Sequence, residues 1–278
     1  MTVFELSALI FMGALAAGLL GSLTGLGGGI IIVPLLTLVF HVDIRYAIGA
    51  SLVTVIATSS GAAAAYVKEG FTNVRVGMLL EVATTVGALT GAFVAGLIEP
   101  RVIAIIFGLV LLQSAWQTTR QRVERTGDGS PDRIATWLAL DSSYPTPTGP
   151  VWYQVRHVPT GFGIMYLAGI LSGLLGIGSG VVKVLAMDRA MRLPFKVSTT
   201  TSNFMIGVTA AASAGVYLHR GYIDPGLAFP VMLGVLCGAL VGARVLPGFK
   251  TARLRTVFAV VVVVMAAEML YNGIAGRI

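Results

Sequence analysis

The stretch SLTGLGGGIIIVP at residues 22–34 has a second copy, GLLGIGSGVVKVL, at residues 173–185. The match continues along the chain at a constant separation of 151 residues, which links Ser51 to Ser202, Thr58 to Thr209, and Gly87–Ala92 to Gly238–Ala243. Self-similarity at one fixed offset is the signature of an internal repeat. The chain therefore consists of two copies of one structural unit.

The composition indicates a membrane protein. Hydrophobic residues make up 56% of the 278 residues and charged residues 11%, and the mean hydropathy is +0.88. Such a chain has too little polar surface to cover a soluble globule of this size. Its long apolar runs, at a rise of about 1.5 Å per helical residue, match a hydrocarbon core of about 30 Å. We expect an all-α polytopic protein embedded in a lipid bilayer.

The basic residues predict the topology, because positively charged loops stay in the cytoplasm. Five hydrophobic elements per repeat, the short one after the glycines included, place most Lys and Arg on one side of the membrane. That side carries Lys68, Arg75, Arg120, Arg122, Arg125, Arg133, Arg156, Arg189, Arg192, Lys196, Lys250, Arg253 and Arg255, and the other side carries Arg45, Arg101, Arg220 and Arg277. Four elements per repeat would divide them almost evenly. An odd number inverts the second copy, as in many secondary transporters.

This topology divides the chain into three parts. Residues 1–119 form the first membrane repeat, residues 120–158 a cytoplasmic segment, and residues 159–278 the second, inverted repeat, with both termini outside. The short elements can span the membrane or be re-entrant, since the parity is the same in either case. In the cytoplasmic segment, the runs 136–140 and 151–155 could pair as a small hairpin across DSSYPTPTGP. The segment is a linker or, alternatively, a regulatory or partner-binding element.

The glycine runs predict a break in the second element of each repeat. Gly27, Gly28 and Gly29 interrupt a helix because each glycine costs about 1 kcal/mol relative to alanine in a helix interior. Gly178, Ser179 and Gly180 form the matching run. Unwound backbone persists at membrane depth only where protein or a water-filled cavity satisfies it.

A binding site is therefore expected where the two breaks meet. Helices that begin at Ile30 and Val181 would point their N-termini into it, and free N–H groups at a helix N-terminus attract anions. The alternative is that the glycines only let helices pack closely, as we expect for the pairs Gly87/Gly91 and Gly238/Gly242.

Lys183 is the most informative charged residue, because it lies in an apolar run where the first repeat has Ile32. A charge at the centre of a spanning helix costs about 2.5–3.5 kcal/mol on insertion scales, so it usually marks function. We expect Lys183 to hold a small anion. The alternatives are a salt bridge to Asp188 or a side chain that snorkels to the surface.

Further polar residues in apolar runs complete the expected site. The second repeat contains six consecutive polar residues, 198–203, more than helix packing usually requires. Neutral donors suit an anion that must also be released, and the candidates are Ser51, Thr54, Thr201, Ser202 and Asn203. Glu81 and Glu268, also within apolar runs, could carry protons or could pair with a basic neighbour.

Enzyme motifs are absent from the sequence. GLGGGI lacks the third glycine of a dinucleotide fingerprint and follows a predicted membrane helix, and no Gly-Lys-Ser/Thr forms a phosphate loop. The three histidines lie in or beside predicted loops. We expect no enzyme activity, no cofactor and no metal site. The basic balance reflects topology and does not indicate nucleic acid.

The paired motifs GLGGGIIIVP and GIGSGVVKV, together with TSNFMIGVTAAASA, resemble those of the TauE/SafE family of sulfite and organosulfonate exporters. The resemblance implies a bacterial or archaeal inner-membrane permease for a sulfur-containing anion, driven by an ion gradient. Three features depart from the pattern. Ser179 replaces a glycine, Leu185 stands where the first repeat has Pro34, and the segment between the repeats is long.

We therefore expect a secondary transporter that exports sulfite, sulfoacetate or a related sulfonate by alternating access, coupled to H⁺ or Na⁺. The alternatives are a channel-like conduit, a transporter of another small anion such as a carboxylate, and a membrane scaffold that acts through the cytoplasmic segment. The sequence leaves the oligomeric state open, a homodimer included.

Overall fold

The computed structural model describes residues 3–22, 29–119, 132–146, 149–245 and 251–278, and within these ranges it is almost entirely helical. The first half comprises α1 (Val3–Ser22), α2 (Gly29–Pro34), which continues as the π-helical turn η1 (Leu35–Val39), α3 (Ile44–Lys68), α4 (Val74–Ala95) and α5 (Pro100–Thr119). The second comprises α7 (Val158–Leu175), α8 (Gly180–Leu185), which continues as η2 (Ala186–Ala190), α9 (Phe195–His219), α10 (Pro225–Val245) and α11 (Thr251–Ala275).

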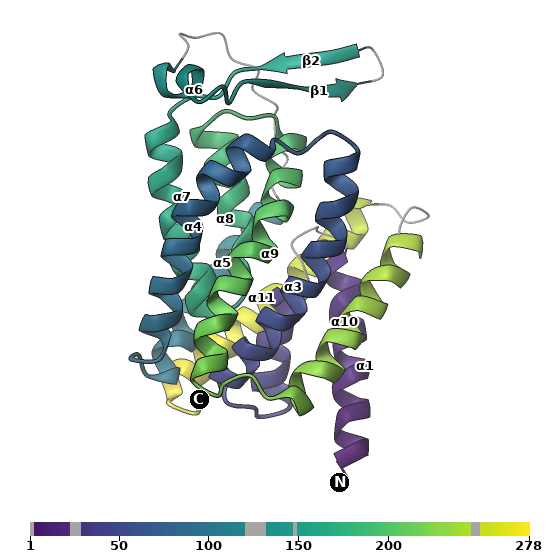
Figure 1. Ribbon diagram of the computed structural model, residues 1–278. Helices are drawn as coiled ribbons and strands as arrows, with labels where there is room; N and C mark the ends of the chain where they lie inside the picture. Colours follow the sequence, from purple (N-terminus) through teal and green to yellow (C-terminus); the bar gives the residue numbers. More distant parts are fainter. Residues whose placement is uncertain (1–2, 23–28, 120–131, 147–148, 246–250) are drawn as a thin grey trace.

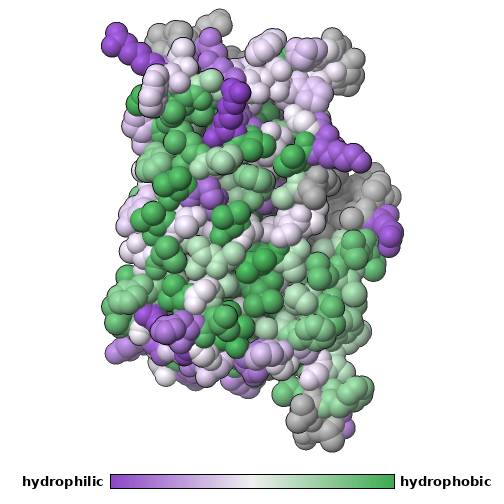
Figure 2. Space-filling view, viewed as in Figure 1, coloured by the Kyte–Doolittle hydropathy of each residue, from purple (hydrophilic) through white to green (hydrophobic). Residues whose placement is uncertain are grey.

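Among the described residues, six helices are long and apolar enough to cross a membrane: α1, α4, α5, α7, α10 and α11. Figure 2 shows why a bilayer suits the molecule, since apolar side chains cover its middle and hydrophilic ones gather towards its two ends. The long helices α3 and α9, of 25 residues each, pack against one another in the centre (Figure 1). The chain is a polytopic helical membrane protein.

The helices pair across the two halves of the chain. Helix α1 packs against α10, α4 against α7, α5 against α11 and α3 against α9. The chain ends lie together at one end of the bundle and a small hairpin caps the other (Figure 1). Helix α1 therefore starts at the end opposite to the start of α7, and the two run in opposite directions.

Glycines allow the closest of these contacts, as the sequence predicted. A Cβ atom at Gly91 of α4 would overlap the carbonyl oxygen of Ile170 in α7, and one at Gly238 of α10 would overlap that of Leu15 in α1. Gly87 meets the Tyr166 carbonyl in the same way. The packing role of these three glycines is confirmed.

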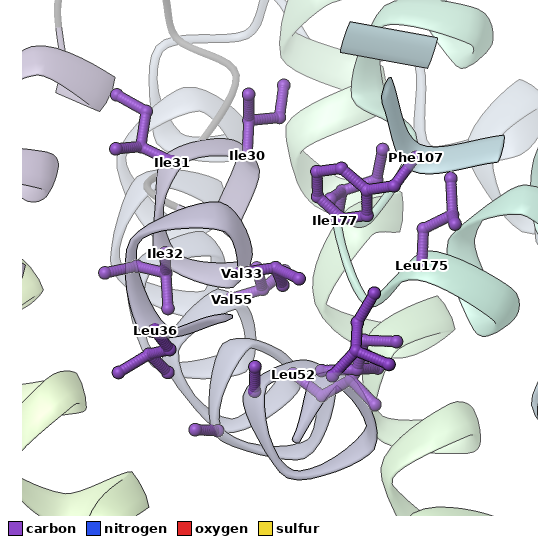
Figure 3. Packing of buried hydrophobic residues seen from close by; sticks show 14 of the residues in the cluster. Ile30, Ile31, Ile32, Val33, Leu36, Leu52, Val55, Phe107, Leu175 and Ile177 are labelled. Atoms are coloured by element: carbon purple, nitrogen blue, oxygen red, sulfur yellow. The ribbon is translucent and has the colours of Figure 1, made fainter. Parts of the chain in front are cut away.

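Helix α2 is enclosed by apolar side chains. All six of its residues are buried. In Figure 3 its residues Ile30–Val33 gather with Leu52 and Val55 of α3 and with Ile177 of the second half, and all belong to one hydrophobic cluster. An apolar helix this short is stable here because neighbouring helices bury it on every side.

The segment between the halves is folded. Helix α6 (Arg133–Trp137) is followed by the antiparallel strands β1 (Ser142–Thr146) and β2 (Gly149–Tyr153). A hairpin is therefore present, but the prediction that residues 136–140 form its first strand is wrong. Asp132 caps α6 by accepting from the Ile134 N–H at 2.9 Å, so residues 133–137 begin a helix and the strand starts later.

We call α6 and the two strands, within residues 133–153, the cap, and hydrogen bonds hold it to both halves of the chain. The Asn73 side chain, which caps α4, donates to the Leu140 carbonyl at 2.9 Å and to the Tyr153 hydroxyl at 2.8 Å. The Arg156 N–H donates to the Met191 carbonyl beyond η2 at 3.1 Å. Burial raises the pKa of the Tyr153 hydroxyl. The described residues of this segment are therefore docked on the bundle.

Candidate functional site

Lys183 is completely buried near the middle of the molecule. Its exposed fraction is 0%, and its Nζ atom donates to the Thr209 hydroxyl of α9 at 2.6 Å. A side chain that snorkelled would place its ammonium group at the surface, so this alternative is excluded. An ammonium group without water is stable only when it is paired and hydrogen-bonded.

Thr209 connects Lys183 to Glu81 of α4. The Thr209 Oγ1 atom lies 2.7 Å from Glu81 Oε1, and the Thr85 hydroxyl donates to the same carboxyl oxygen at 3.2 Å. Glu81 is 9% exposed. Its second oxygen, Oε2, is buried and has no hydrogen-bond partner among the described residues. Two opposite charges from different halves of the chain thus meet through one hydroxyl group, and we call Glu81, Thr209 and Lys183 the buried triad.

The turn between α7, which ends at Leu175, and α8, which begins at Gly180, positions Lys183. Gly176, Gly178 and Ser179 all have positive φ angles, of 67°, 68° and 43°. For Ser179 this left-handed conformation carries strain, and its hydroxyl donates to the Ala168 carbonyl of α7 at 2.6 Å. That bond fixes the start of α8 on α7. Lys183 follows one turn later, with its N–H bonded to the Ser179 carbonyl at 3.1 Å.

Ser51 and Ser202 occupy matching positions at the two short helices. The Ser51 hydroxyl lies 3.4 Å from the carbonyl of Gly29 and 2.8 Å from that of Gly176. The Ser202 hydroxyl donates to the Gly180 carbonyl at 3.2 Å. Both serines are buried. Their hydroxyls therefore hold the first residues of α2 and α8 against α3 and α9.

The remaining predicted polar residues differ in whether their side chains already form hydrogen bonds within the protein. Thr54 donates to the Ala50 carbonyl at 2.9 Å within its own helix, and Thr201 accepts from the Asn73 N–H at 3.0 Å. Asn203 is 8% exposed, and its side-chain amide makes no hydrogen bond to any described residue. A side-chain amide without a protein partner has free donors and an acceptor. Asn203 is thus the predicted residue most open to a ligand.

Glu268 lies apart from the buried triad. It is exposed on α11, where the Asn272 side chain donates to its main-chain carbonyl at 3.0 Å. The structure therefore brings together Glu81 and Lys183 but leaves Glu268 on the outer surface of the bundle. Gly27 and Gly28 lie outside the described residues. Gly29 is buried against Val55 and Ser51.

Thr209 was not among the predicted site residues. The signal that could have found it is its match with Thr58 at the repeat offset, combined with its place within the apolar length of α9. Its partner Glu81 belongs to the other half, so no local pattern connects them. Within the described ranges, no three His, Cys, Asp or Glu side chains gather as metal ligands would.

Buried charged side chains of opposite sign, linked by a hydroxyl group inside a bundle with an apolar belt, are a feature of membrane transporters. The sequence model of the family described as "Sulfite exporter TauE/SafE" matches residues 10–269. This chain belongs to that family, which confirms the resemblance noted in the sequence.

Relatives cover nearly the whole chain. It is 28% identical to "Probable membrane transporter protein YunE" of Bacillus subtilis (strain 168), over 94% of this chain and 96% of the relative. It is 25% identical to "Probable membrane transporter protein MJ0441" of Methanocaldococcus jannaschii, over 95% of each. No solved structure matches the chain. The protein is a multi-pass membrane transporter of the TauE/SafE family.

Proposed function

We propose that this protein is a secondary transporter that exports a small sulfur-containing anion, such as sulfite, sulfoacetate or a related sulfonate, through the cytoplasmic membrane of a bacterium or archaeon. The observation that carries the proposal is the fully buried Lys183. A buried ammonium group attracts an anion strongly because little solvent screens it. The family description supports sulfite among the candidate anions.

The two halves act as inverted repeats in this proposal. Three observations support it: α1 and α7 run in opposite directions, the helix pairs α1–α10 and α4–α7 match at the repeat offset, and Ser51 and Ser202 make the same bond to their short helices. Alternating access then follows from rocking the α1–α10 pair against the α4–α7 pair around the site. The interlocked pairs would move as rigid units because their contacts leave no space for sliding.

The cap end of the bundle faces the cytoplasm in this proposal. Arg75 and Arg156 lie in or beside the cap, where the Arg75 guanidinium donates to the Ala139 carbonyl at 2.9 Å. At the other end, Arg45 donates to the Ile98 carbonyl and Arg220 to the Ala92 carbonyl. The larger share of basic residues belongs to the cap end, which supports the orientation by the positive-inside rule.

Asn203 completes the proposed anion site as a neutral donor. It follows Ser202, which contacts the start of α8, and its amide is free among the described residues. Ser51, Thr54, Thr201 and Ser202 are proposed as surrounding polar residues. Gly27, Gly28, Gly29, Gly178, Ser179 and Gly180 are proposed to let the backbone approach the anion.

Counterflow in proteoliposomes tests the proposal. Liposomes loaded with unlabelled anion should accumulate the labelled form, with sulfite, thiosulfate, sulfonates and carboxylates compared as a panel. Lys183→Met should reduce exchange at least tenfold, and Lys183→Arg should retain part of it because the charge remains. Arg244→Met is the matched control, since Arg244 is an exposed basic residue of α10. Exchange by Lys183→Met at the wild-type rate would refute the proposed site.

The same assay separates the alternatives. A channel-like conduit would give flux without accumulation of label against a gradient, and preference for carboxylates in the panel would replace the sulfur-containing substrate. Deletion of the cap with loss of function but intact counterflow would favour the scaffold.

A further inference from the structure

Only one of the two carboxyl oxygens of Glu81 has hydrogen-bond partners. Its Oε1 atom lies 2.7 Å from the Thr209 hydroxyl and 3.2 Å from the Thr85 hydroxyl. Its Oε2 atom is buried without a partner among the described residues. An ionised carboxylate gains from donors on both oxygens, and a buried oxygen without one carries a desolvation cost. A proton on Glu81 would remove that charge. Glu81 therefore has the surroundings of a group that changes its protonation state.

The Thr209 hydroxyl has three acceptors within reach. Its Oγ1 atom accepts from Lys183 Nζ at 2.6 Å, so its single proton can go to Glu81 Oε1 at 2.7 Å, to the Met205 carbonyl at 3.0 Å or to the Thr84 hydroxyl at 3.4 Å. When Glu81 is ionised, the proton points to the carboxylate and the triad is neutral overall. When Glu81 is protonated on Oε1, that O–H donates to Thr209 Oγ1, the Thr209 proton turns to the Met205 carbonyl, and the charge of Lys183 has no counter-charge within the triad.

Among the described residues, no charged side chain of α7 or α9 hydrogen-bonds to Glu81 or Lys183. Helix α7, which packs against α4, has no charged residue, and its one titratable side chain, Tyr166, makes no hydrogen bond to Glu81. On α9 the charges are at the ends, where Lys196 lies over the Phe71 ring and His219 is the last residue. Further charged or titratable side chains are Arg75 at the start of α4, Tyr153 on Asn73, and Asp188 and Arg189 in η2. Glu81 and Lys183 thus control each other's charge.

We infer that Glu81 binds the coupling proton, and that proton and anion bind together because protonation of Glu81 releases Lys183 to pair with the anion. The inference rests on the proposed transport function and specifies its coupling ion and stoichiometry. One proton from solution forms the O–H bond on Glu81, and one anion takes the place of the carboxylate as the partner of Lys183. The empty carrier returns with Glu81 ionised and the internal pair restored. Thr209 is the positioning residue that connects the two events.

The coupling fixes how the gradients act. Proton and anion move in the same direction, so net outward flux occurs when the outward anion ratio exceeds the opposing proton ratio. Where Glu81 is ionised in the empty carrier, the KM for a monovalent or divalent anion should fall about tenfold for each unit by which the pH decreases, since each binding event takes up one proton.

An imposed pH gradient in proteoliposomes tests the inference. The probe is the panel anion that exchanges in counterflow, and protein-free liposomes correct for passive permeation. Wild-type protein should accumulate the probe in liposomes with an alkaline lumen and should carry one proton per anion. Glu81→Gln, which mimics the protonated group, should lose this accumulation, and its exchange KM should no longer vary with pH. Glu268→Gln, which alters an exposed carboxyl group of the last helix, should respond to the gradient as wild type does.

Two Thr209 variants test the connection. Thr209→Val removes the hydroxyl and should uncouple anion and proton flux, whereas Thr209→Ser restores the hydroxyl and should restore the pH dependence. A merely structural role would give the same pH dependence in all variants. Proton-driven accumulation by Glu81→Gln at the wild-type level would overturn the inference.

A direct measurement covers the case in which Glu81→Gln does not fold. Wild-type protein in weakly buffered detergent solution should take up about one proton per bound probe anion, by the same linkage. Anion binding without proton uptake would also overturn the inference. If no panel anion exchanges with wild-type protein, the proposed function itself fails, and this outcome is distinct from exchange that is insensitive to the gradient.

Discussion

The two short helices, α2 and α8, occupy matching places in the repeat and make the same contact, because Ser51 reaches the Gly29 carbonyl and Ser202 the Gly180 carbonyl. Their environments differ. Helix α2 carries Ile32 inside the hydrophobic cluster, whereas α8 carries Lys183 at the equivalent position. One copy of the unit is a packing element and the other holds a charge.

The other two members of the buried triad also differ from their counterparts, Glu81 in residue type and Thr209 in its hydrogen bonds. The counterpart of Glu81 is Met232, and that of Thr209 is Thr58, which bonds only to main-chain carbonyls of its own helix. Lys183 and Glu81 therefore stand at positions where the other copy has Ile32 and Met232, and the two charges of the buried triad have no charged counterpart at the repeat offset.

The largest effect is expected when Lys183 and Glu81 are replaced by the residue types of their counterparts, Ile32 and Met232. Lys183→Ile leaves Glu81 buried without its counter-charge and should lower the free energy of unfolding by about 3–5 kcal/mol. The double variant Lys183→Ile with Glu81→Met should regain most of that stability while showing no anion exchange. Thermal unfolding in detergent and counterflow measure the two effects. A double variant less stable than the single one would contradict this account, and Arg244→Ile serves as the control for charge loss.

The glycine contacts between helices test a feature that the two halves share. Gly87 of α4 and its counterpart Gly238 of α10 each face a carbonyl oxygen of the partner helix. Substitution by alanine should overpack either contact and cost about 1–3 kcal/mol, with similar values in the two halves. A Cβ atom at Gly163 of α7 would meet no other atom within 4 Å, so Gly163→Ala should be neutral or slightly stabilising. A large difference between the Gly87 and Gly238 variants in thermal unfolding would show that the halves differ mechanically.

The cap has no counterpart among the described residues at the opposite end of the bundle. A loss of cap stability at low pH should be the smallest of the predicted effects. The pKa of Asp132 lies below its ordinary value, chiefly because the Val158 N–H donates to the carboxylate, with further bonds from Ile134 and Ala135. This stability is present above the unfolded pKa and is lost as the pH falls through the folded value, below about 4. The protection of residues 133–140 against hydrogen exchange, relative to the intrinsic exchange rate at each pH, should therefore fall below this pH in the wild type.

Asp132→Asn should weaken this pH dependence. Asp224→Asn is the matched control, because Asp224 accepts from the Gly226 N–H at the start of α10 and lies outside the cap. Identical acid responses in wild type and Asp132→Asn would remove Asp132 from the account.

The sequence predicted the features that depend on nearby residues or on composition. The membrane environment follows from the apolar content, the close contacts at Gly87 and Gly91 from their spacing, and the second strand of the hairpin from the alternation in 151–155. The first strand was placed wrongly because Asp132 begins a helical turn, a preference that competes with strand propensity in the next five residues. The partnership of Asn73 with that cap was not visible at all.

The sequence by itself determined that this is a two-copy membrane protein with a lysine in one copy where the other has isoleucine, since apolar runs, glycine spacing and the repeat offset can be compared along the chain. Only the tertiary structure decided that Lys183 would meet Glu81 through Thr209 and that Glu268 would stay outside. Thr209 and Glu81 are 128 residues apart, whereas Thr209 and Lys183 are 26 apart. The physical reason is that helix packing, and no local preference, chooses which buried charges share one hydroxyl group.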